Sequence, residues 1–186
     1  LGVATGYTRS SLNGGSDTSA DSNNFHLAVY GSKQINALAL RTGVAYSWHR
    51  FDTKRSVAFG SQSDNLKAKY GAQTGQLFTE AAYGMNTSLL DLEPFANLSY
   101  ANFRNNGMNE HGGAAALNAD KQSKNATFST LGLRAAKKWQ TENELAVSLY
   151  GELGWQHQFG NIDRGTKLSF SNSNTSFTLN SVAASR

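Results

Sequence analysis

The sequence predicts an all-β fold, an antiparallel up-and-down transmembrane β-barrel meander of about seven strands. Three observations predict it: alternating apolar and polar residues, connections that alternate between long and short, and aromatic residues near both ends of the apolar faces. The alternation is clear in residues 143–160, where Leu149 and Leu153 share one face and Glu152 lies on the other. Successive side chains of a strand point to opposite faces, so this segment has one apolar and one polar face.

Composition limits the function classes. The chain has 186 residues, a mean hydropathy of −0.47 and a formal net charge of +4, and residues 1–186 are expected to form a single domain. A barrel alternates apolar and polar residues, so this hydropathy does not exclude one. No run of 18 apolar residues exists, which excludes transmembrane helices. The absence of cysteine excludes a disulfide framework, and the scattered basic residues argue against nucleic-acid binding.

Seven segments carry the alternation. They span residues 1–10, 25–33, 37–51, 66–85, 89–103, 126–139 and 143–160. Pro94 lies inside the fifth segment and, because proline lacks a ladder donor, it is expected at a strand end or a bulge. Further strand pieces are expected at 167–170 and 176–179.

The connections alternate in length. Polar loops rich in Gly, Ser, Asn and Asp are expected at 11–24, 52–65 and 104–125, and the chain stays polar after Gly160. Short turns are expected between the remaining neighbours, at residues 34–36, 86–88 and 140–143. An antiparallel meander puts alternate connections at opposite ends, so the long loops share one side. Outer-membrane barrels have this asymmetry, which predicts the bacterial outer membrane with the long loops extracellular.

Aromatic residues fall at both ends of the apolar faces. Near the end with the long loops lie Tyr7, Phe25, Tyr46, Trp48, Tyr100 and Trp155, and near the other end lie Tyr83 and Trp139. Indole and phenol rings concentrate at the two interfaces of a bilayer. The sequence therefore predicts membrane-interface roles for Tyr46, Trp48, Tyr83, Tyr100, Trp139 and Trp155.

Several motifs together resemble a known family. In chain order they are GYTRSSL, HLAVYG, LRTGVAYSWHRFDTKRSVAF, LEPFANLSYANF, HGGAAAL, FSTLGLRA and LGWQHQFGN. They resemble the C-terminal translocator of bacterial autotransporters over nearly the whole chain. The resemblance implies a twelve-stranded outer-membrane barrel whose pore is threaded by a linker helix that leads to a secreted passenger domain.

The same resemblance implies partners and missing parts. Expected partners are outer-membrane lipid and lipopolysaccharide, the protein's own passenger and linker helix, the barrel-assembly machinery and periplasmic chaperones. The sequence begins in mid-pattern, so about two strands and the linker helix are expected before Leu1 and about three strands after Arg186. Seven of twelve strands would then be present, and this segment alone is not expected to close as a barrel.

The polar faces predict the functional residues. In a closed barrel they line a wet lumen. We expect pore-lining positions that contact the linker helix or the passenger at Arg41, Glu80, Asn97, Arg134, Glu152 and Gln156. The alternative is that these charges pair across the lumen and only stiffen the barrel.

Catalytic and metal sites are not expected. The four histidines lack metal-ligand spacing, and no Gly-x-Ser-x-Gly elbow is present. His26 and His49 are expected in the lumen, and His157 on the lipid face. The segment HGGAAAL, residues 111–117, is expected to pack in a loop or over the pore mouth. The domain is predicted to be non-enzymatic and to need no cofactor.

Two other functions remain open from the sequence alone. The first is an outer-membrane pore or adhesin-type barrel without a passenger, which would conduct small solutes. The second is a soluble carbohydrate-binding sandwich, in which the apolar faces would form a buried core. The sorting of aromatic residues to two ends argues against the sandwich.

Overall fold

The protein is all-β in a computed structural model that describes residues 1–15, 17–60, 62–140, 146–160, 165–173 and 175–180. No described helix is long and apolar enough to cross a membrane. The strands are β1 (Gly2–Asn13), β2 (Thr18–Ile35), β3 (Leu38–Phe59), β4 (Gln62–Tyr83), β5 (Met85–Asn86), β6 (Asp91–Asn105), β7 (Met108–Asn109), β8 (Leu117–Ala119), β9 (Gln122–Gln140), β10 (Ala146–Phe159), β11 (Gly165–Phe170) and β12 (Ser176–Asn180).

The long strands form one antiparallel sheet in the order β1-β2-β3-β4-β6-β9-β10, which is also their order along the chain. The short β5 pairs with the start of β6. Each long strand therefore pairs with its neighbour in sequence, as an up-and-down meander requires, and the predicted seven-stranded architecture is confirmed. The expected start of the seventh strand, residues 143–145, lies outside the described residues.

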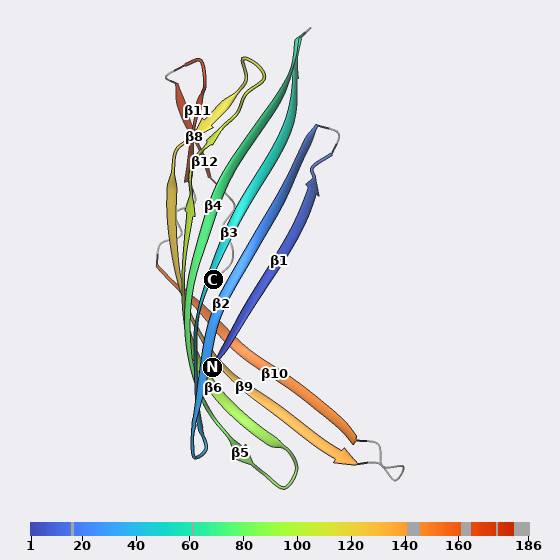
Figure 1. The fold of residues 1–186 in the computed structure, drawn as a ribbon, viewed down its shortest axis with the longest axis vertical. Helices are drawn as coiled ribbons and strands as arrows, with labels where there is room; N and C mark the ends of the chain where they lie inside the picture. The colour runs from blue at the N-terminus through green and yellow to red at the C-terminus, as the bar shows by residue number, and fades with distance from the viewer. Residues whose placement is uncertain (16, 61, 141–145, 161–164, 174, 181–186) are drawn as a thin grey trace.

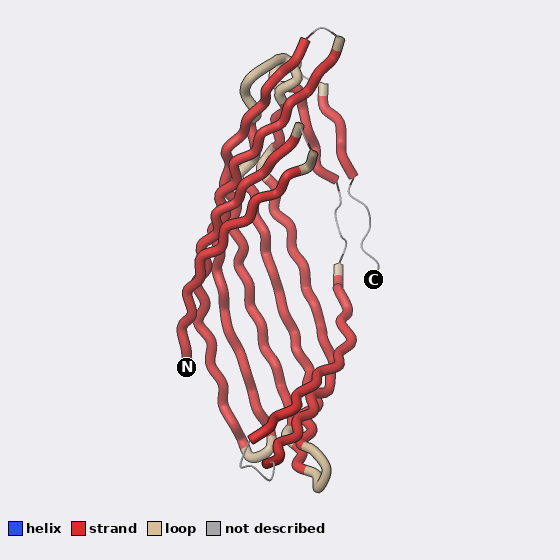
Figure 2. Tube along the Cα trace, turned by 90° about the vertical axis from the view of Figure 1, so that its right-hand side faces the viewer, coloured by secondary structure: helices blue, strands red, loops and turns tan. Residues whose placement is uncertain are grey.

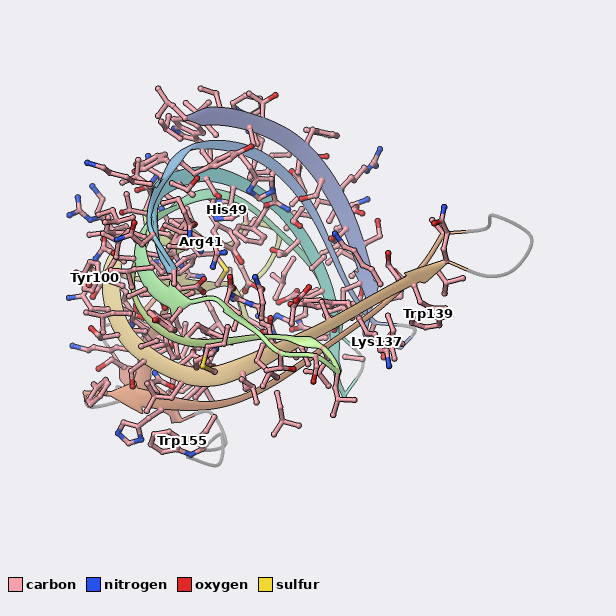
Figure 3. All side chains as sticks on the ribbon, turned by 90° about the horizontal axis from the view of Figure 1, so that it is seen from below. Arg41, His49, Tyr100, Lys137, Trp139 and Trp155 are labelled. Atoms are coloured by element: carbon pink, nitrogen blue, oxygen red, sulfur yellow. The ribbon has the colours of Figure 1, made fainter. Side chains whose placement is uncertain are left out.

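The sheet is strongly curved (Figures 1 and 2). Viewed along its length, the ribbons follow an arc, with Arg41 and His49 inside it and Tyr100 and Trp155 outside (Figure 3). The convex face carries the apolar residues of the alternation, and large ones such as Leu98 and Leu153 are 50% and 82% exposed. Leucines that are uncovered in a folded sheet need an apolar neighbour, which a lipid bilayer supplies.

Alternate connections gather at opposite ends of the sheet, as predicted. The tips of the β1–β2 and β3–β4 hairpins point to the upper end in Figure 1, and the β2–β3 and β5–β6 turns lie at the lower end. The lower turns are short. Between β2 and β3 only Asn36 and Ala37 remain, and Asn36 takes a positive φ of 53° that lets the chain reverse tightly.

Two of the predicted polar loops are wrong. The described residues of 11–24 and 52–65 are almost wholly strand, and antiparallel pairing continues as far as Asn13 with Ser19 and Phe59 with Gln62. Polar side chains on both faces of a strand do not prevent its backbone from pairing. In these segments the polar side chains form hydrogen bonds with side chains of the neighbouring strand. Ser11 donates to Asp21, and Ser56 Oγ donates to Asn65 Oδ1 at 2.8 Å.

The third predicted loop, 104–125, also contains strands. Its β7 and β8 join β11 and β12 in a second sheet of order β12-β11-β8-β7, which we call the capping sheet. The segment before β8 packs on β4, since His111 and Lys67 exchange backbone hydrogen bonds of 2.9 Å. Leu66 and Ala68 of β4 are buried there at 1% and 3% exposure. Both lie an even number of residues from Glu80, so their side chains point to the same, concave face. Because they are buried at the capping sheet, that sheet covers this end of the concave face.

An ion pair ties the capping sheet to β3. Arg55 Nη2 lies 2.5 Å from Glu110 Oε2, and the Glu110 side chain is only 8% exposed. The same carboxylate oxygen accepts the Leu117 backbone N–H at 3.0 Å, while Arg55 donates to the Ala115 carbonyl at 3.2 Å. Residues 111–117, which were expected in a loop or over the pore mouth, are thus held against β3 and β4, with Ala116 3% exposed.

Replacing Glu110 with alanine is expected to release the capping sheet without unfolding the large one. The change leaves the Arg55 guanidinium unpaired at a cost of about 3 kcal/mol, the usual loss for one partner of a buried pair. Limited proteolysis of the folded full-length protein should then cut residues 104–125 faster. Asp120→Ala, at an exposed site in the same segment, is the control, and equal cleavage of both variants would contradict the role of the ion pair.

Pro94 lies inside β6, not at its end, and pairs with Leu133 of β9. On its other side the ladder is interrupted. Pairing between β4 and β6 stops at Ala82 and Phe95, and pairing with β5 begins at Met85 and Leu92. The missing proline donor therefore falls at a gap in the ladder, which explains how β6 tolerates it.

Candidate functional site

A cluster of five charged residues occupies the concave face. Five adjacent strands contribute one residue each: Arg41 from β3, Glu80 from β4, Glu93 from β6, Arg134 from β9 and Glu152 from β10. We call this set the lumen charge cluster. The two-residue period of the strands places each side chain on the concave face, and the register aligns them, with Arg41 opposite Glu80 and Arg134 between Glu93 and Glu152.

Arg134 is the hub of the cluster. Its Nη1 lies 2.8 Å from Oε1 of both Glu80 and Glu93, and its Nη2 lies 2.9 Å from Glu80 Oε2. Its Nε donates to Glu152 Oε2 at 2.8 Å. One guanidinium thereby joins carboxylates from three other strands, using the planar fork of donors that only arginine has.

Arg41 completes the cluster from the other side. Its Nη1 lies 2.8 Å from Glu80 Oε1 and 3.0 Å from Glu93 Oε1, and its Nη2 lies 2.9 Å from Glu93 Oε2. The Glu80 and Glu93 side chains are 9% and 26% exposed, so solvent screens these pairs less than surface pairs. Two guanidiniums face three carboxylates, which leaves one negative charge in excess.

Aromatic side chains frame the cluster. The Arg134 guanidinium carbon lies 3.9 Å above the centroid of the Phe95 ring, a cation–π contact. Tyr150 donates its hydroxyl to Glu152 Oε2 at 2.9 Å. A hollow of about 470 Å³ opens above the cluster, lined by Arg41, Phe78, Glu80, Glu93, Arg134 and Tyr150. The arrangement presents carboxylates and π faces to the space inside the curve, a surface suited to a cationic group.

Four of the six predicted pore-lining residues belong to the lumen charge cluster. Asn97 and Gln156 lie on the same face, in the register row of Glu80, but outside the ion pairs. Gln156 Nε2 donates to Thr130 Oγ1 at 3.3 Å instead.

Sequence reasoning missed Glu93 and its aromatic neighbours. The alternation that assigns Asn97 to the concave face also assigns Glu93 and Phe95, which lie an even number of residues away. Pro94 between them concealed this signal, because it weakened the expectation of a strand there. Tyr150 could have been found in the same way, since it lies two residues from Glu152 and therefore on the same face.

The predicted interface aromatics all lie on the convex face and are exposed: Tyr46, Trp48, Tyr83, Tyr100, Trp139 and Trp155. Trp48 is in register with Phe25, and Phe25 with Tyr7, which makes one aromatic row over three strands. Gln73 is the β4 partner of Trp48, and Tyr83 lies ten residues further along that strand. A tilted strand needs about 9–11 residues to cross the hydrocarbon core, so the two aromatic levels have the spacing of a bilayer.

Two of the histidines, His26 and His49, make side-chain hydrogen bonds within the sheet. His26 bonds Ser47 and His49 bonds Asn24 and Thr74, each at 2.8 Å, on the concave face where both were expected. His157 stacks on Trp155 with ring centroids 5.7 Å apart, on the convex side. Among the described residues, no three His, Asp or Glu side chains are grouped as a metal ion requires.

The family is decided by comparison with known proteins. The autotransporter beta-domain model matches residues 1–186, the whole chain. The chain belongs to the autotransporter beta-domain family. Domains of this family are outer-membrane β-barrels of type V secretion, which anchor a protein and export its passenger to the cell surface.

This autotransporter beta-domain matches one part of each of two larger proteins. Two extracellular serine proteases of Serratia marcescens are 56% and 55% identical to it over 186 residues. The match covers 100% of this chain but 18% of each relative, so the chain spans about a fifth of their length. The translocator domain of autotransporter NalP from Neisseria meningitidis shares its fold, with a TM-score of 0.71 and 13% identity over 92% of this chain and 64% of that one.

Proposed function

We propose that the lumen charge cluster contacts the linker helix and the exported passenger of this autotransporter beta-domain. The observation that carries the proposal is the excess of one carboxylate over guanidinium groups in a hollow that opens to the inside of the curve. A lysine or arginine on the translocating chain would neutralise that excess by charge-assisted hydrogen bonds. Glu152 is the available partner, since its side chain is 44% exposed and only one of its oxygens is bonded to described residues.

The passenger that fits the relatives best is a secreted serine protease. The two relatives named above are extracellular serine proteases and match this chain along its entire length. The catalytic residues would lie in the part of such a protein outside this chain, and the beta-domain itself would remain non-enzymatic. This assignment predicts a protease domain encoded in the same gene.

The orientation is argued from the aromatic row, and the assembly partners are those that the family resemblance implies. With the hairpin tips and the capping sheet outside the cell, the row of Tyr7, Phe25 and Trp48 lies at the outer interface, in contact with outer-membrane lipid and lipopolysaccharide. Delivery to this site would require periplasmic chaperones and the barrel-assembly machinery. Residues 1–186 would act as part of a single barrel domain.

Glu152→Gln in the full-length protein is the first test. The change removes the surplus charge but keeps the side chain's size, and the glutamine amide oxygen still accepts a hydrogen bond. The passenger should therefore reach the surface more slowly, by about threefold to tenfold, as expected when a charge-assisted hydrogen bond becomes a neutral one. Surface passenger is measured by protease accessibility on whole cells, and folded barrel by its shifted electrophoretic mobility before heating.

Asp91→Asn is the matched control, because Asp91 lies on the concave face of β6 outside the cluster. Unchanged display in Glu152→Gln, or equal loss in both variants, would remove Glu152 from the export mechanism. A pore without a passenger is the competing function. It predicts a steady conductance of the purified barrel and no effect of the substitution on any surface domain.

A further inference from the structure

The convex face carries basic residues just beyond the aromatic row of Tyr7, Phe25 and Trp48. Arg9 lies two residues beyond Tyr7 on β1, and Arg50 lies two residues beyond Trp48 on β3, both toward the hairpin tips. A step of two residues keeps the same face, so both guanidiniums point outward with the aromatic rings. Both residues are exposed, and neither forms an ion pair with any described residue.

Two lysines stand opposite each other further along the same hairpin. Lys54 of β3 and Lys67 of β4 are direct register partners on the convex face. Like charges in directly opposed positions destabilise a sheet. No carboxylate of the described residues is paired with either lysine. An anion held between the two ammonium groups would relieve the repulsion. We call Arg9, Arg50, Lys54 and Lys67 the convex basic surface.

Two carboxylates lie in the row between these pairs, and both already have partners. Asp21 accepts the Ser11 hydroxyl, and Asp52 Oδ1 lies 3.0 Å from Lys69 Nζ. The charge of Asp52 is therefore balanced by Lys69, whereas Asp21 keeps its negative charge because a hydroxyl donor does not cancel it. The four cations of the convex basic surface outnumber this one carboxylate, so the surface keeps a positive excess. At the opposite end of the sheet the convex face has only two scattered cations among the described residues, Lys33 and Lys137.

We propose that the convex basic surface binds the phosphate groups of a bisphosphorylated glycolipid in the leaflet at the hairpin end. In a bilayer the lipid phosphates lie just outside the level of the interfacial aromatic rings. Arg9 and Arg50, two residues beyond Tyr7 and Trp48, lie at that phosphate level. Arginine donates in a planar fork that matches phosphate, and lysine supplies compact charge.

The convex basic surface has two separate groups of cations, one for each phosphate of one lipid. Arg9 and Arg50 are separated by one intervening strand, about 10 Å at the usual strand spacing. Lys54 lies four residues beyond Arg50 on β3, about 13 Å along the strand. The lipopolysaccharide anchor carries two phosphates on a disaccharide and is the lipid to which the proposal commits.

The proposal rests on the proposed orientation and is tested separately from export. The purified full-length protein in neutral detergent is titrated with bisphosphorylated lipid A, and bound lipid is counted by native mass spectrometry. The double variant Lys54→Gln/Lys67→Gln should bind at least about fivefold more weakly, since one basic residue near a charged membrane surface contributes about a fivefold factor. Lys33→Gln/Lys137→Gln is the matched control and should bind as the unchanged protein does.

Each outcome of the titration decides the proposal. Weaker binding of the Lys54/Lys67 variant alone supports it, and equal affinities in both double variants overturn it. Binding of phosphatidylglycerol or of dephosphorylated lipid A as tight as that of bisphosphorylated lipid A also overturns it. Export and cell fractionation are measured on the same variants. Hairpin tips that protease cuts only after the outer membrane has been opened would refute the proposed orientation, whereas normal export with no lipid preference would refute only the lipid site.

Discussion

Gly132→Ala is expected to lower the stability of the barrel sharply, whereas Gly154→Ala is expected to change it little. A Cβ at Gly132 would lie 2.4 Å from a ring carbon of Phe95 and 2.8 Å from the Leu153 carbonyl oxygen, so the ring or β10 must move. Phe95 is 7% exposed and packs with Ala39 and Ala82, which leaves it no free space. Overpacking of this kind costs about 1–3 kcal/mol.

Gly154 provides a control on the same face. It is the register partner of Gly132 on β10, and its Cβ would meet nothing closer than Thr130 Cγ2 at 3.4 Å. Urea unfolding of the full-length protein in lipid vesicles measures the difference between the two variants. Adding Phe95→Leu to Gly132→Ala should recover part of the loss. Equal unfolding midpoints for the two glycine variants would show that the Phe95 ring is free to move.

Arg134→Met is expected to destabilise the barrel and to make its stability depend on pH. The substitution leaves Glu80, Glu93 and Glu152 facing one another, with Arg41 as the remaining cation of the cluster. The expected cost at neutral pH is about 1–3 kcal/mol, between the values for exposed and for buried pairs because the cluster is partly solvated. Acidification neutralises the carboxylates and removes their repulsion, so part of the loss should return at low pH.

The measurement is again urea unfolding, at neutral and acidic pH. Arg104→Met is the control, since Arg104 lies on the exposed convex side and its side chain bonds, within the described part of the chain, only that of Asn102. Glu93→Gln added to Arg134→Met should restore stability at neutral pH. If Arg134→Met lowers the free energy of unfolding equally at both pH values, the loss comes from the missing contact with Phe95 and not from carboxylate repulsion.

The sequence was sufficient to predict which face each side chain occupies. Leu131 and Arg134 were assigned to opposite faces because a strand has a period of two, and the observed pairing needs no bulge to keep them there. The strand ends were predicted less well. Beyond the level of Trp48 the convex face carries polar and charged residues such as Arg50 and Lys54, so the apolar alternation stops at residue 51 while the ladder continues to Phe59.

Contacts between residues far apart in the sequence could not be predicted from local alternation. Arg55 and Glu110 lie 55 residues apart, and their ion pair depends on how the segment after β6 folds back on β4. The hub role of Arg134 has the same origin. Its contact with Glu80 crosses β6 diagonally, so the register of three strands must be known before it can be seen.

The length of the β3–β4 hairpin has a consequence for what meets the cell surface first. β3 continues for eleven residues past Trp48, a rise of about 35 Å along the strand. Pairing with β2 ends at Arg55, so only Ser56–Phe59 and their β4 partners Gln62–Asn65 form a two-stranded ribbon. With the tips outside, this ribbon stands above the headgroups and among the sugars of neighbouring glycolipids. Antibodies and bacteriophages would reach that ribbon before any other part of the described sheet. Asp64 is constrained because it accepts the Ala115 backbone N–H, but side chains nearer the tip are free to vary as long as cross-strand pairing is kept. Antigenic change at the tip therefore need not disturb the barrel beneath.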